Sequence, residues 1–251
     1  MRAADAAPLT EEQARAAAAG HKAMMPFGRP FLDHVLHNLA EAGVADVCLV
    51  TAPVHDEVRA YYGALATHRI RVSCTIQATP RGTADAVAAA GAFFSRGPAI
   101  VINGDNLYPV AALEALAESG GPAVVAFSRS GLLSGGQMPA SRIEKFALIV
   151  SRDGWLDHVL EKPDAAAVAA AGADAQVSMN CWVLPPEILD VIRTLPLSPR
   201  GELELPMAVG FLVERGVRFK VIPCDTPVLD LSQRGDVAAV GAALAGREVR
   251  L

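Results

Sequence analysis

Aromatic residues are scarce in this chain. Only 5% of its 251 residues are Phe, Trp or Tyr, although 52% are hydrophobic, and alanine and valine carry the excess. This composition favours a parallel sheet packed between helices over a β-sandwich. A chain of this length buries on the order of 75% of its extended surface when it folds. We therefore expect one domain over residues 1–251 that needs neither a disulfide nor a structural metal.

Basic residues are also in short supply. Lys and Arg number 22 against 27 Asp and Glu, which leaves a net charge of −5. No basic run stands out, so neither nucleic acid nor a membrane surface is expected as the main partner. No apolar run reaches the roughly 18 residues of a membrane span. Asp5, Glu11 and Glu12 interrupt the first twenty residues, so we expect no signal peptide there.

The four cysteines lie singly in apolar runs, at Cys48, Cys74, Cys181 and Cys224. No Cys-x-x-Cys and no paired histidine spacing is present, which excludes the usual zinc and redox motifs. We expect reduced core cysteines and a cytoplasmic protein.

Strand-like and helix-like segments alternate along the chain. The expected helices cover residues 11–19, 31–42, 55–65, 83–94, 110–118, 164–171, 186–195, 202–215 and 232–245. The expected strands cover residues 44–51, 70–77, 99–103, 122–128, 146–151, 156–160, 177–184 and 218–223. This alternation predicts an α/β fold: a three-layer α/β/α, Rossmann-like and mostly parallel sheet.

The second half departs from this rhythm. Residues 130–141 are rich in Gly and Ser and predict a mobile loop. The strands on either side of the Arg152-Asp153-Gly154 turn predict a hairpin. We expect the last hundred residues to form a small β-rich extension that decorates the sheet edge and covers a pocket.

The most informative stretch covers residues 76–86 and 99–106. It reads as a short apolar strand, a glycine-containing turn that opens a helix, and a second apolar strand that ends at Asp105. Ligands of open α/β sheets lie outside the carboxyl ends of the strands. Backbone N–H groups at a helix start suit phosphate, and a carboxylate suits Mg²⁺. The stretch therefore predicts a site for a nucleotide phosphate with Mg²⁺.

Seven short segments carry a resemblance to a known family. They are His21–Phe31 with its Lys22 and Gly28-Arg29-Pro30; Gln77 with Arg81-Gly82-Thr83-Ala84; Asn103-Gly104-Asp105-Asn106; Leu160-Glu161-Lys162-Pro163; Met179-Asn180; Arg200-Gly201-Glu202-Leu203-Glu204-Leu205; and Leu229-Asp230-Leu231 with Asp236. In this order the segments resemble the nucleotidyltransferase superfamily that includes the sugar-1-phosphate nucleotidylyltransferases.

The resemblance implies a Mg²⁺-dependent enzyme. It implies transfer of a nucleotidyl group from a nucleoside triphosphate to a sugar 1-phosphate or similar phosphorylated acceptor, with release of pyrophosphate. Residues 1–128 would form the nucleotide-binding half and residues 129–251 the acceptor-binding half. Exposed sheet edges or residues 177–184 could pair subunits in a homo-oligomer.

The resemblance also assigns roles to individual residues. The catalytic residues are Lys22, Asp105 and Asp230, and the two aspartates hold the metal. The nucleotide-binding residues are Gln77, Gly82, Thr83 and Gly104, and the acceptor-binding residues are Glu161, Lys162 and Asn180.

Simpler roles stand beside these assignments. Asp105 and Thr83 could each cap the helix that follows, and Asp236 is expected to cap the last helix. Lys22 could be a solvated surface lysine. Lys162 could lie in a plain exposed turn.

One part of the family pattern is missing. The family begins with a strand and a Gly-rich G-x-G-T-R loop that wraps the triphosphate, but no G-x-G lies upstream of Lys22. Either the start falls inside a longer gene, or the protein lacks the loop and acts as a nucleotide-sugar-binding or regulatory homologue. Without that strand, a sheet would expose unpaired backbone and apolar surface at its centre.

A glycosyltransferase with a related fold is a third hypothesis. Such enzymes usually carry Asp-x-Asp at the strand end. Here the sequence is Asp105-Asn106-Leu107, so the second aspartate is absent and this hypothesis is disfavoured.

Overall fold

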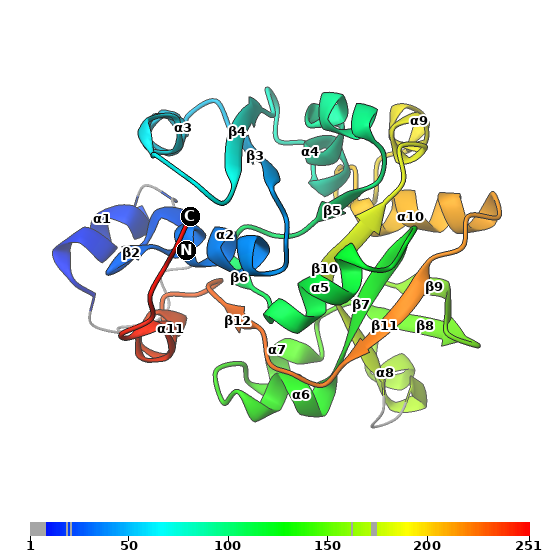
Figure 1. Ribbon diagram of the computed structural model, residues 1–251. Coiled ribbons are helices and arrows are strands. Elements are labelled where there is room, and N and C mark those ends of the chain that lie inside the picture. The colour runs from blue at the N-terminus through cyan, green and yellow to red at the C-terminus, as the bar shows by residue number, and fades with distance from the viewer. Residues whose placement is uncertain (1–8, 19, 21, 162, 172–174) are drawn as a thin grey trace.

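The computed structural model describes residues 9–18, 20, 22–161, 163–171 and 175–251 (Figure 1). The helices are α1 Glu11–Ala18, α2 Phe31–Glu41, α3 Asp56–Ala64, α4 Thr83–Ala89, α5 Val110–Ala117, α6 Arg129–Ser134, α7 Ala140–Ile143, α8 Ala165–Ala171, α9 Ile188–Thr194, α10 Leu205–Glu214 and α11 Asp236–Leu244, with 3₁₀ turns η1 Lys22–Met24 and η2 Gly91–Arg96. The strands are β1 Pro26–Phe27, β2 Arg29–Pro30, β3 Asp46–Thr51, β4 Arg71–Ile76, β5 Ala99–Val101, β6 Asn106–Leu107, β7 Ala123–Ser128, β8 Leu148–Arg152, β9 Trp155–Leu160, β10 Gln176–Leu184, β11 Lys220–Cys224 and β12 Leu229–Asp230. The predicted α/β class is confirmed. No helix within the described ranges has the length and apolar character needed to cross a bilayer.

The largest sheet has six strands in the order β5-β10-β7-β11-β9-β8. β11 runs parallel to β7, whereas the long β10 is antiparallel to β5, to β7 and, at its first two residues, to β8. β5, β7 and β11 therefore share one direction, and β10 is inserted between them in the opposite one. The predicted hairpin is present as β8 and β9, which pair across the turn at Asp153 and Gly154.

A second, smaller sheet lies beside the first. β3 and β4 pair in parallel from Asp46 opposite Arg71 to Thr51 opposite Ile76. Figure 1 shows this pair apart from the larger sheet, with β3 on the side of β5. Among the described residues, β3 is hydrogen-bonded to β4 alone and β5 to β10 alone. The sheet is thus interrupted between β3 and β5.

Helices α6 and α7 occupy much of the stretch that the sequence predicted to be a mobile loop. That prediction is wrong, and Ser128 and Gly131 explain why. The Ser128 hydroxyl accepts a hydrogen bond from Gly131 N at 2.9 Å and so caps α6. A side chain at Gly131 would collide with the backbone of Asp225. Serine and glycine here serve capping and close packing.

Helix α2 is held to α3 through a buried carboxylate. Asp33 is fully buried and accepts hydrogen bonds from Arg29 Nε at 2.7 Å and from the hydroxyls of Tyr61 and Tyr62 at 2.8 Å each. Burial and the Asp33 charge raise the pKa of Tyr62 well above its ordinary value. Its hydroxyl therefore stays a donor, and Asp33 keeps its partners.

Candidate functional site

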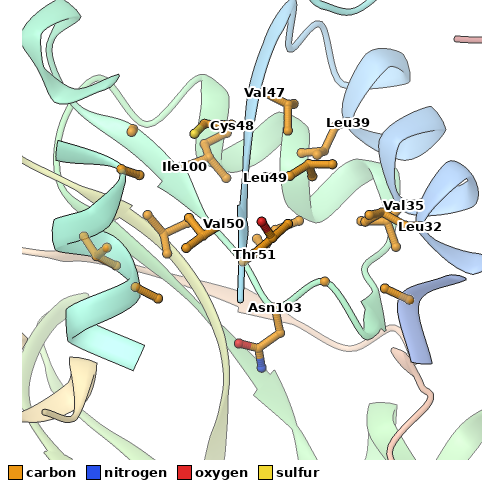
Figure 2. Close-up of a pocket in the computed structure, with 18 of the residues that line it drawn as sticks. Leu32, Val35, Leu39, Val47, Cys48, Leu49, Val50, Thr51, Ile100 and Asn103 are labelled. Carbon is orange, nitrogen blue, oxygen red and sulfur yellow. The ribbon is translucent and has the colours of Figure 1, made fainter. Parts of the chain in front are cut away.

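A cavity of about 830 Å³ lies between β3 and β5, and residues at the carboxyl ends of both strands are among those that line it (Figure 2). Five of the residues that the sequence assigned to the site line it: Lys22, Thr83, Gly104, Asp105 and Asn180. They come from separate parts of the chain and meet where an open α/β sheet normally binds its ligand.

Asp105 occupies the turn that follows β5. Its Oδ2 lies 3.7 Å from Lys22 Nζ, and Lys22, in η1, also lines the cavity. Burial raises the pKa of the Asp105 carboxyl; Lys22 opposes this rise, and the negative charge of Asp230 adds to it. Asp105 is therefore a partly desolvated carboxylate with one nearby cation, the setting in which a metal ion or a protonated group is favoured.

A short ladder places Asp230 beside Asp105. β6 and β12 pair antiparallel with Asn106 opposite Asp230, and Leu231 N donates to Asp105 O at 2.9 Å. The two aspartates, far apart in sequence, therefore belong to one cluster of backbone hydrogen bonds.

The Asp230 carboxylate is fully engaged by side chains of the protein. Its Oδ1 accepts hydrogen bonds from Asn106 Nδ2 at 3.1 Å and from Ser232 Oγ at 2.5 Å. Its Oδ2 pairs with Arg142 Nη1 at 3.1 Å, and its side chain is only 4% exposed. Asp230 is thus fixed and neutralised, in contrast to Asp105.

Two residues that hold Asp230 were not predicted from the sequence. Arg142 bridges it to Asp236, with Nη2 at 2.9 Å from Asp236 Oδ1. Gln137 donates to Asp230 O at 2.7 Å and accepts from Asp230 N at 3.1 Å. Both follow or lie in the stretch predicted to be a loop, and no local pattern marks them.

Asp236 itself differs from its predicted role. The N-cap of α11 is Gly235, without a side-chain cap. The Asp236 carboxylate instead accepts from Gln233 N at 2.6 Å and pairs with Arg142. The prediction that it caps this helix is wrong because a long-range cation claims its second oxygen.

The residues present fit a magnesium ion bound together with phosphate. No group of three His, Cys, Asp or Glu side chains suited to a metal occurs in the described part of the chain. Mg²⁺ is usually held by one or two carboxylates plus substrate phosphates and water. Asp105, about a third exposed, suits that role. Asp230 suits it only if Arg142 gives up Oδ2.

Gln77 shapes the turn that follows β4. Its Nε2 donates to Gly82 O at 3.1 Å and to Asp85 Oδ2 at 2.8 Å. Arg81 Nη2 binds the other oxygen of Asp85 at 2.6 Å. The amide nitrogen of Gln77, a residue assigned to nucleotide binding, is therefore engaged within the turn itself.

Gly82 and Thr83 join this turn to the start of α10. Gly82 has φ +121°, and a Cβ there would lie 2.5 Å from Leu203 O. Ala84 N donates to the same carbonyl at 2.9 Å. Thr83 Oγ1 accepts from Leu205 N at 2.9 Å, and no side chain caps α4. The predicted cap of the following helix is wrong, because the hydroxyl serves α10 instead.

The predicted acceptor residues are spread over two places. Asn180 has a left-handed φ of +55° and lies in β10 where its register with β7 shifts between Ser178 and Trp182. Such strained bulge positions often re-aim a side chain near a site. Glu161 is exposed just after β9, and its charge contributes, after those of Glu204 and Glu202, to the raised pKa of Arg200. Lys162 lies outside the described residues.

Known proteins are similar to this chain in sequence and in fold. The curated relative is the low-salt glycan biosynthesis nucleotidyltransferase Agl11 of Haloferax volcanii, 25% identical over 202 residues, which are 78% of this chain and 52% of that protein. This chain thus spans about half the length of the curated relative it matches.

Solved structures share the fold. UDP-glucose pyrophosphorylase in complex with UDP-glucose has a TM-score of 0.70 at 16% identity, covering 90% of this chain and 91% of that one. A putative glucose-1-phosphate thymidylyltransferase from Bacillus anthracis, in complex with a sucrose, has a TM-score of 0.72 at 18% identity, covering 91% and 88%.

A family model described as Nucleotidyl transferase matches residues 8–222, which is most of the chain. The chain therefore belongs to the nucleotidyl transferase family.

Proposed function

We propose that this protein transfers a nucleotidyl group from a nucleoside triphosphate to a sugar 1-phosphate or a similar phosphorylated acceptor, in a Mg²⁺-dependent reaction that releases pyrophosphate. The observation that carries the proposal is the placement of Lys22 Nζ 3.7 Å from Asp105 Oδ2 in the lining of the cavity, with Asp230 on the adjoining strand. This is the minimal set of charges that such a transfer needs.

The chemistry asks little of the protein beyond positioning and charge. A phosphate oxygen of the acceptor forms a bond to the α-phosphorus of the triphosphate, and the bond from that phosphorus to the bridging oxygen breaks. The electron pair leaves with pyrophosphate. Because the attacking oxygen is already anionic, no general base is required.

Each site residue has a role that follows from its position. Asp105 would hold Mg²⁺, and the bound ion would neutralise phosphate charge. Lys22 would contact a phosphate oxygen and release Asp105 as it does so. Asn180 lies on the same cavity and would orient the acceptor. Such fixed charges in a desolvated site stabilise developing charge strongly.

Support for a sugar phosphate as the acceptor comes from the related proteins. One solved neighbour holds UDP-glucose, and another carries the name glucose-1-phosphate thymidylyltransferase. The curated relative is named for glycan biosynthesis. A hexose 1-phosphate is therefore the first acceptor to test, with each of the common nucleoside triphosphates in turn.

Pyrophosphate release measured against this panel tests the proposal. Asp105→Asn is expected to lower kcat/KM by about 10²–10³-fold, since it removes a charge that acts on the transition state. Asp190→Asn, on the exposed face of α9, is the matched control and should leave the rate unchanged. Undiminished pyrophosphate release by Asp105→Asn would refute the assignment.

A nucleotide-sugar-binding homologue without turnover is the second candidate function. The observation that favours it is the neutralisation of Asp230 by Arg142, which removes one of two carboxylates from metal binding. Titration calorimetry separates the two: tight nucleotide-sugar binding with no turnover of any triphosphate would support the binding role.

A further inference from the structure

Arg142 is a cation that two buried carboxylates share. Its Nη1 lies 3.1 Å from Asp230 Oδ2, and its Nη2 lies 2.9 Å from Asp236 Oδ1. Because both aspartate side chains are only 4% exposed, water screens their charges weakly. Two negative charges beside one positive charge leave the triad with one negative charge in excess, which favours the arrival of a further cation.

The carboxylate of Asp105 adds to the negative charge of this region. The charge of Asp230 acts on the Asp105 carboxyl, and β6 and β12 hold the two residues in one short ladder. Lys22 balances Asp105 from 3.7 Å. Three negative and two positive side chains therefore gather here, with a net charge of −1. A divalent cation between Asp105 and Asp230 would change this net charge to +1.

Asp230 does not depend on Arg142 for its position. Its Oδ1 accepts hydrogen bonds from Asn106 Nδ2 at 3.1 Å and from Ser232 Oγ at 2.5 Å. Its backbone N and O are both hydrogen-bonded to the Gln137 side chain. These neutral partners would keep the carboxylate in place when Oδ2 exchanges one cation for another.

Arg142 likewise keeps a partner when it leaves Asp230. Asp236 Oδ1 binds Nη2, and Asp236 Oδ2 is fixed by Gln233 N at 2.6 Å. Among the residues that the structure describes, the buried Nε of Arg142 has no acceptor. The contact with Asp230 is the longer of the two ion pairs. It is therefore the contact that can break without leaving the guanidinium unpaired.

We propose that Arg142 occupies Asp230 Oδ2 in the metal-free protein, and that a divalent cation binding between Asp105 and Asp230 displaces Arg142 Nη1 from that oxygen. Arg142 remains paired with Asp236 in both states. It is a positioning residue that sets the metal affinity, and it does not itself touch the reacting atoms. The inference rests on the Mg²⁺ site of the proposed function.

This exchange keeps the buried carboxylates neutralised in both states of the site. Without metal, the arginine prevents an uncompensated charge on Asp230. With metal, the same oxygen serves as a hard ligand of the kind that Mg²⁺ prefers. Binding of metal alone must break one charge-assisted contact, which lowers the affinity by about 10–100-fold. We therefore expect weak metal binding in the absence of a triphosphate.

Binding of Mn²⁺ to the complete protein without nucleotide tests the exchange. Mn²⁺ serves as the probe because the free ion is measured directly by electron paramagnetic resonance. Arg142→Gln removes the competing cation and is expected to tighten Mn²⁺ binding by about 10–100-fold. Arg129→Gln is the matched control. It changes the net charge equally, but its partner is the exposed Glu144, so the affinity should stay unchanged.

Asp236→Asn is expected to act in the opposite direction. It removes the second carboxylate that binds Arg142, so the guanidinium should hold Asp230 more strongly and Mn²⁺ should bind more weakly. In the Arg142→Gln background the same substitution should have little effect, because no arginine is left to redirect. A general loss of structure would not produce two changes of opposite sign.

Thermal stability gives a second measurement that allows for the destabilisation expected of Arg142→Gln. Millimolar Mg²⁺ should restore part of the Tm that this variant loses, because the bound ion replaces the missing positive charge. Leu184→Ala is the control, since it removes packing at a fully buried site. Its Tm should rise with Mg²⁺ by no more than that of the wild type.

Three results would overturn the proposal. Equal Mn²⁺ affinity in Arg142→Gln and the wild type would show that Arg142 does not compete with metal. Tighter binding that persists after Asp230→Asn is added to Arg142→Gln would place the metal elsewhere. Equal Tm gains from Mg²⁺ in Arg142→Gln and Leu184→Ala would show a purely structural role.

The outcome is separate from that of the proposed function. Pyrophosphate release by the wild type together with an unchanged Mn²⁺ affinity in Arg142→Gln would overturn the exchange and leave the proposed function standing. Tighter Mn²⁺ binding in Arg142→Gln without turnover by the wild type would support the exchange and count against the proposed function.

Discussion

The six-stranded sheet and β3, which borders the cavity, have similarly apolar sequences but are packed very differently. Residues 123–127 of β7 are each 0% exposed, and Trp182 of β10 is fully buried against Phe219, with ring centroids 6.2 Å apart. β3 is equally apolar in most of its length, yet five of its six residues are only partly buried. Composition alone therefore does not decide burial; the presence of a neighbouring strand does.

Charged groups show the same contrast. Both carboxylate oxygens of Asp230 are engaged, by Asn106, Ser232 and Arg142. Asp105, which lines the cavity, has Lys22 Nζ at 3.7 Å from its Oδ2. The Asp230 carboxylate is thus satisfied within the protein, whereas the Asp105 carboxylate is available to a ligand.

The largest effect is expected from removing the Arg142 ion pairs with Asp230 and Asp236. Arg142→Gln should lower the free energy of unfolding by about 3–5 kcal/mol, because it leaves two buried carboxylates without their cation. Urea denaturation measures this loss. Arg193→Gln is the control: its partner Asp190 is exposed, and its effect should stay within about 0.5 kcal/mol. Equal effects of the two variants would contradict the buried network.

A matched leucine pair sharpens the packing contrast. Leu184→Ala, at a fully buried site in β10, should cost about 2–5 kcal/mol of unfolding free energy. Leu49→Ala, at a half-buried site in β3 that borders the cavity, should cost about 1 kcal/mol, in proportion to the area that Leu49 buries. Thermal or urea denaturation measures both losses of unfolding free energy. Equal losses would mean that the cavity beside Leu49 is filled in solution.

Two glycines isolate the close approach between the turn and α10. Gly82 and Gly97 have similar backbones, with φ +121° and +116°, but a Cβ meets Leu203 O only at Gly82. Gly97→Ala should cost about 1–3 kcal/mol from backbone strain. Gly82→Ala should cost a further 1–3 kcal/mol or so from overpacking. Equal losses in Tm would mean that this contact is loose.

The smallest effect is expected from Asp105. Its raised pKa means that the folded state holds a proton where the unfolded state has lost it, so stability falls as pH rises above the ordinary value of 3.8. Asp105→Asn removes that fall. The variant should be more stable than the wild type at pH 7, and the difference should shrink as the pH is lowered.

Urea denaturation between pH 4 and 8 measures this difference, with Asp190→Asn as the control for an exposed carboxylate. A variant that is less stable than the wild type at pH 7 would show that Lys22 compensates the burial of Asp105 completely. Gained stability together with lost activity is the trade expected of a catalytic carboxylate.

Much of the fold could be predicted from local pattern. Hydrophobic periodicity predicted the helix of α2, the strand of β3 and the hairpin at Asp153 within a few residues. Position after an apolar strand predicted where Asp105 would lie. These features depend on short-range order, in which each residue's neighbours in sequence are also its neighbours in space.

Capping and charge partners were harder, because they come from distant segments. The Thr83 hydroxyl accepts a hydrogen bond from Leu205 N of α10 instead of capping its own helix, and Asp236 binds Arg142. Neither sequence neighbourhood contains the partner. Glycine and serine in residues 130–141 suggested a loop, since their capping role is visible only once β7 and α6 are placed.

The sequence by itself determined the α/β class, the order of its elements and the carboxylate at the end of β5, because these follow from periodicity and from residues adjacent in the chain. Only the tertiary structure decided that β10 is antiparallel to its neighbours, that Arg142 neutralises Asp230, and that β3 and β5 border a cavity. The reason is physical: strand pairing and buried ion pairs join segments far apart in the chain, and their geometry exists only after the chain has folded.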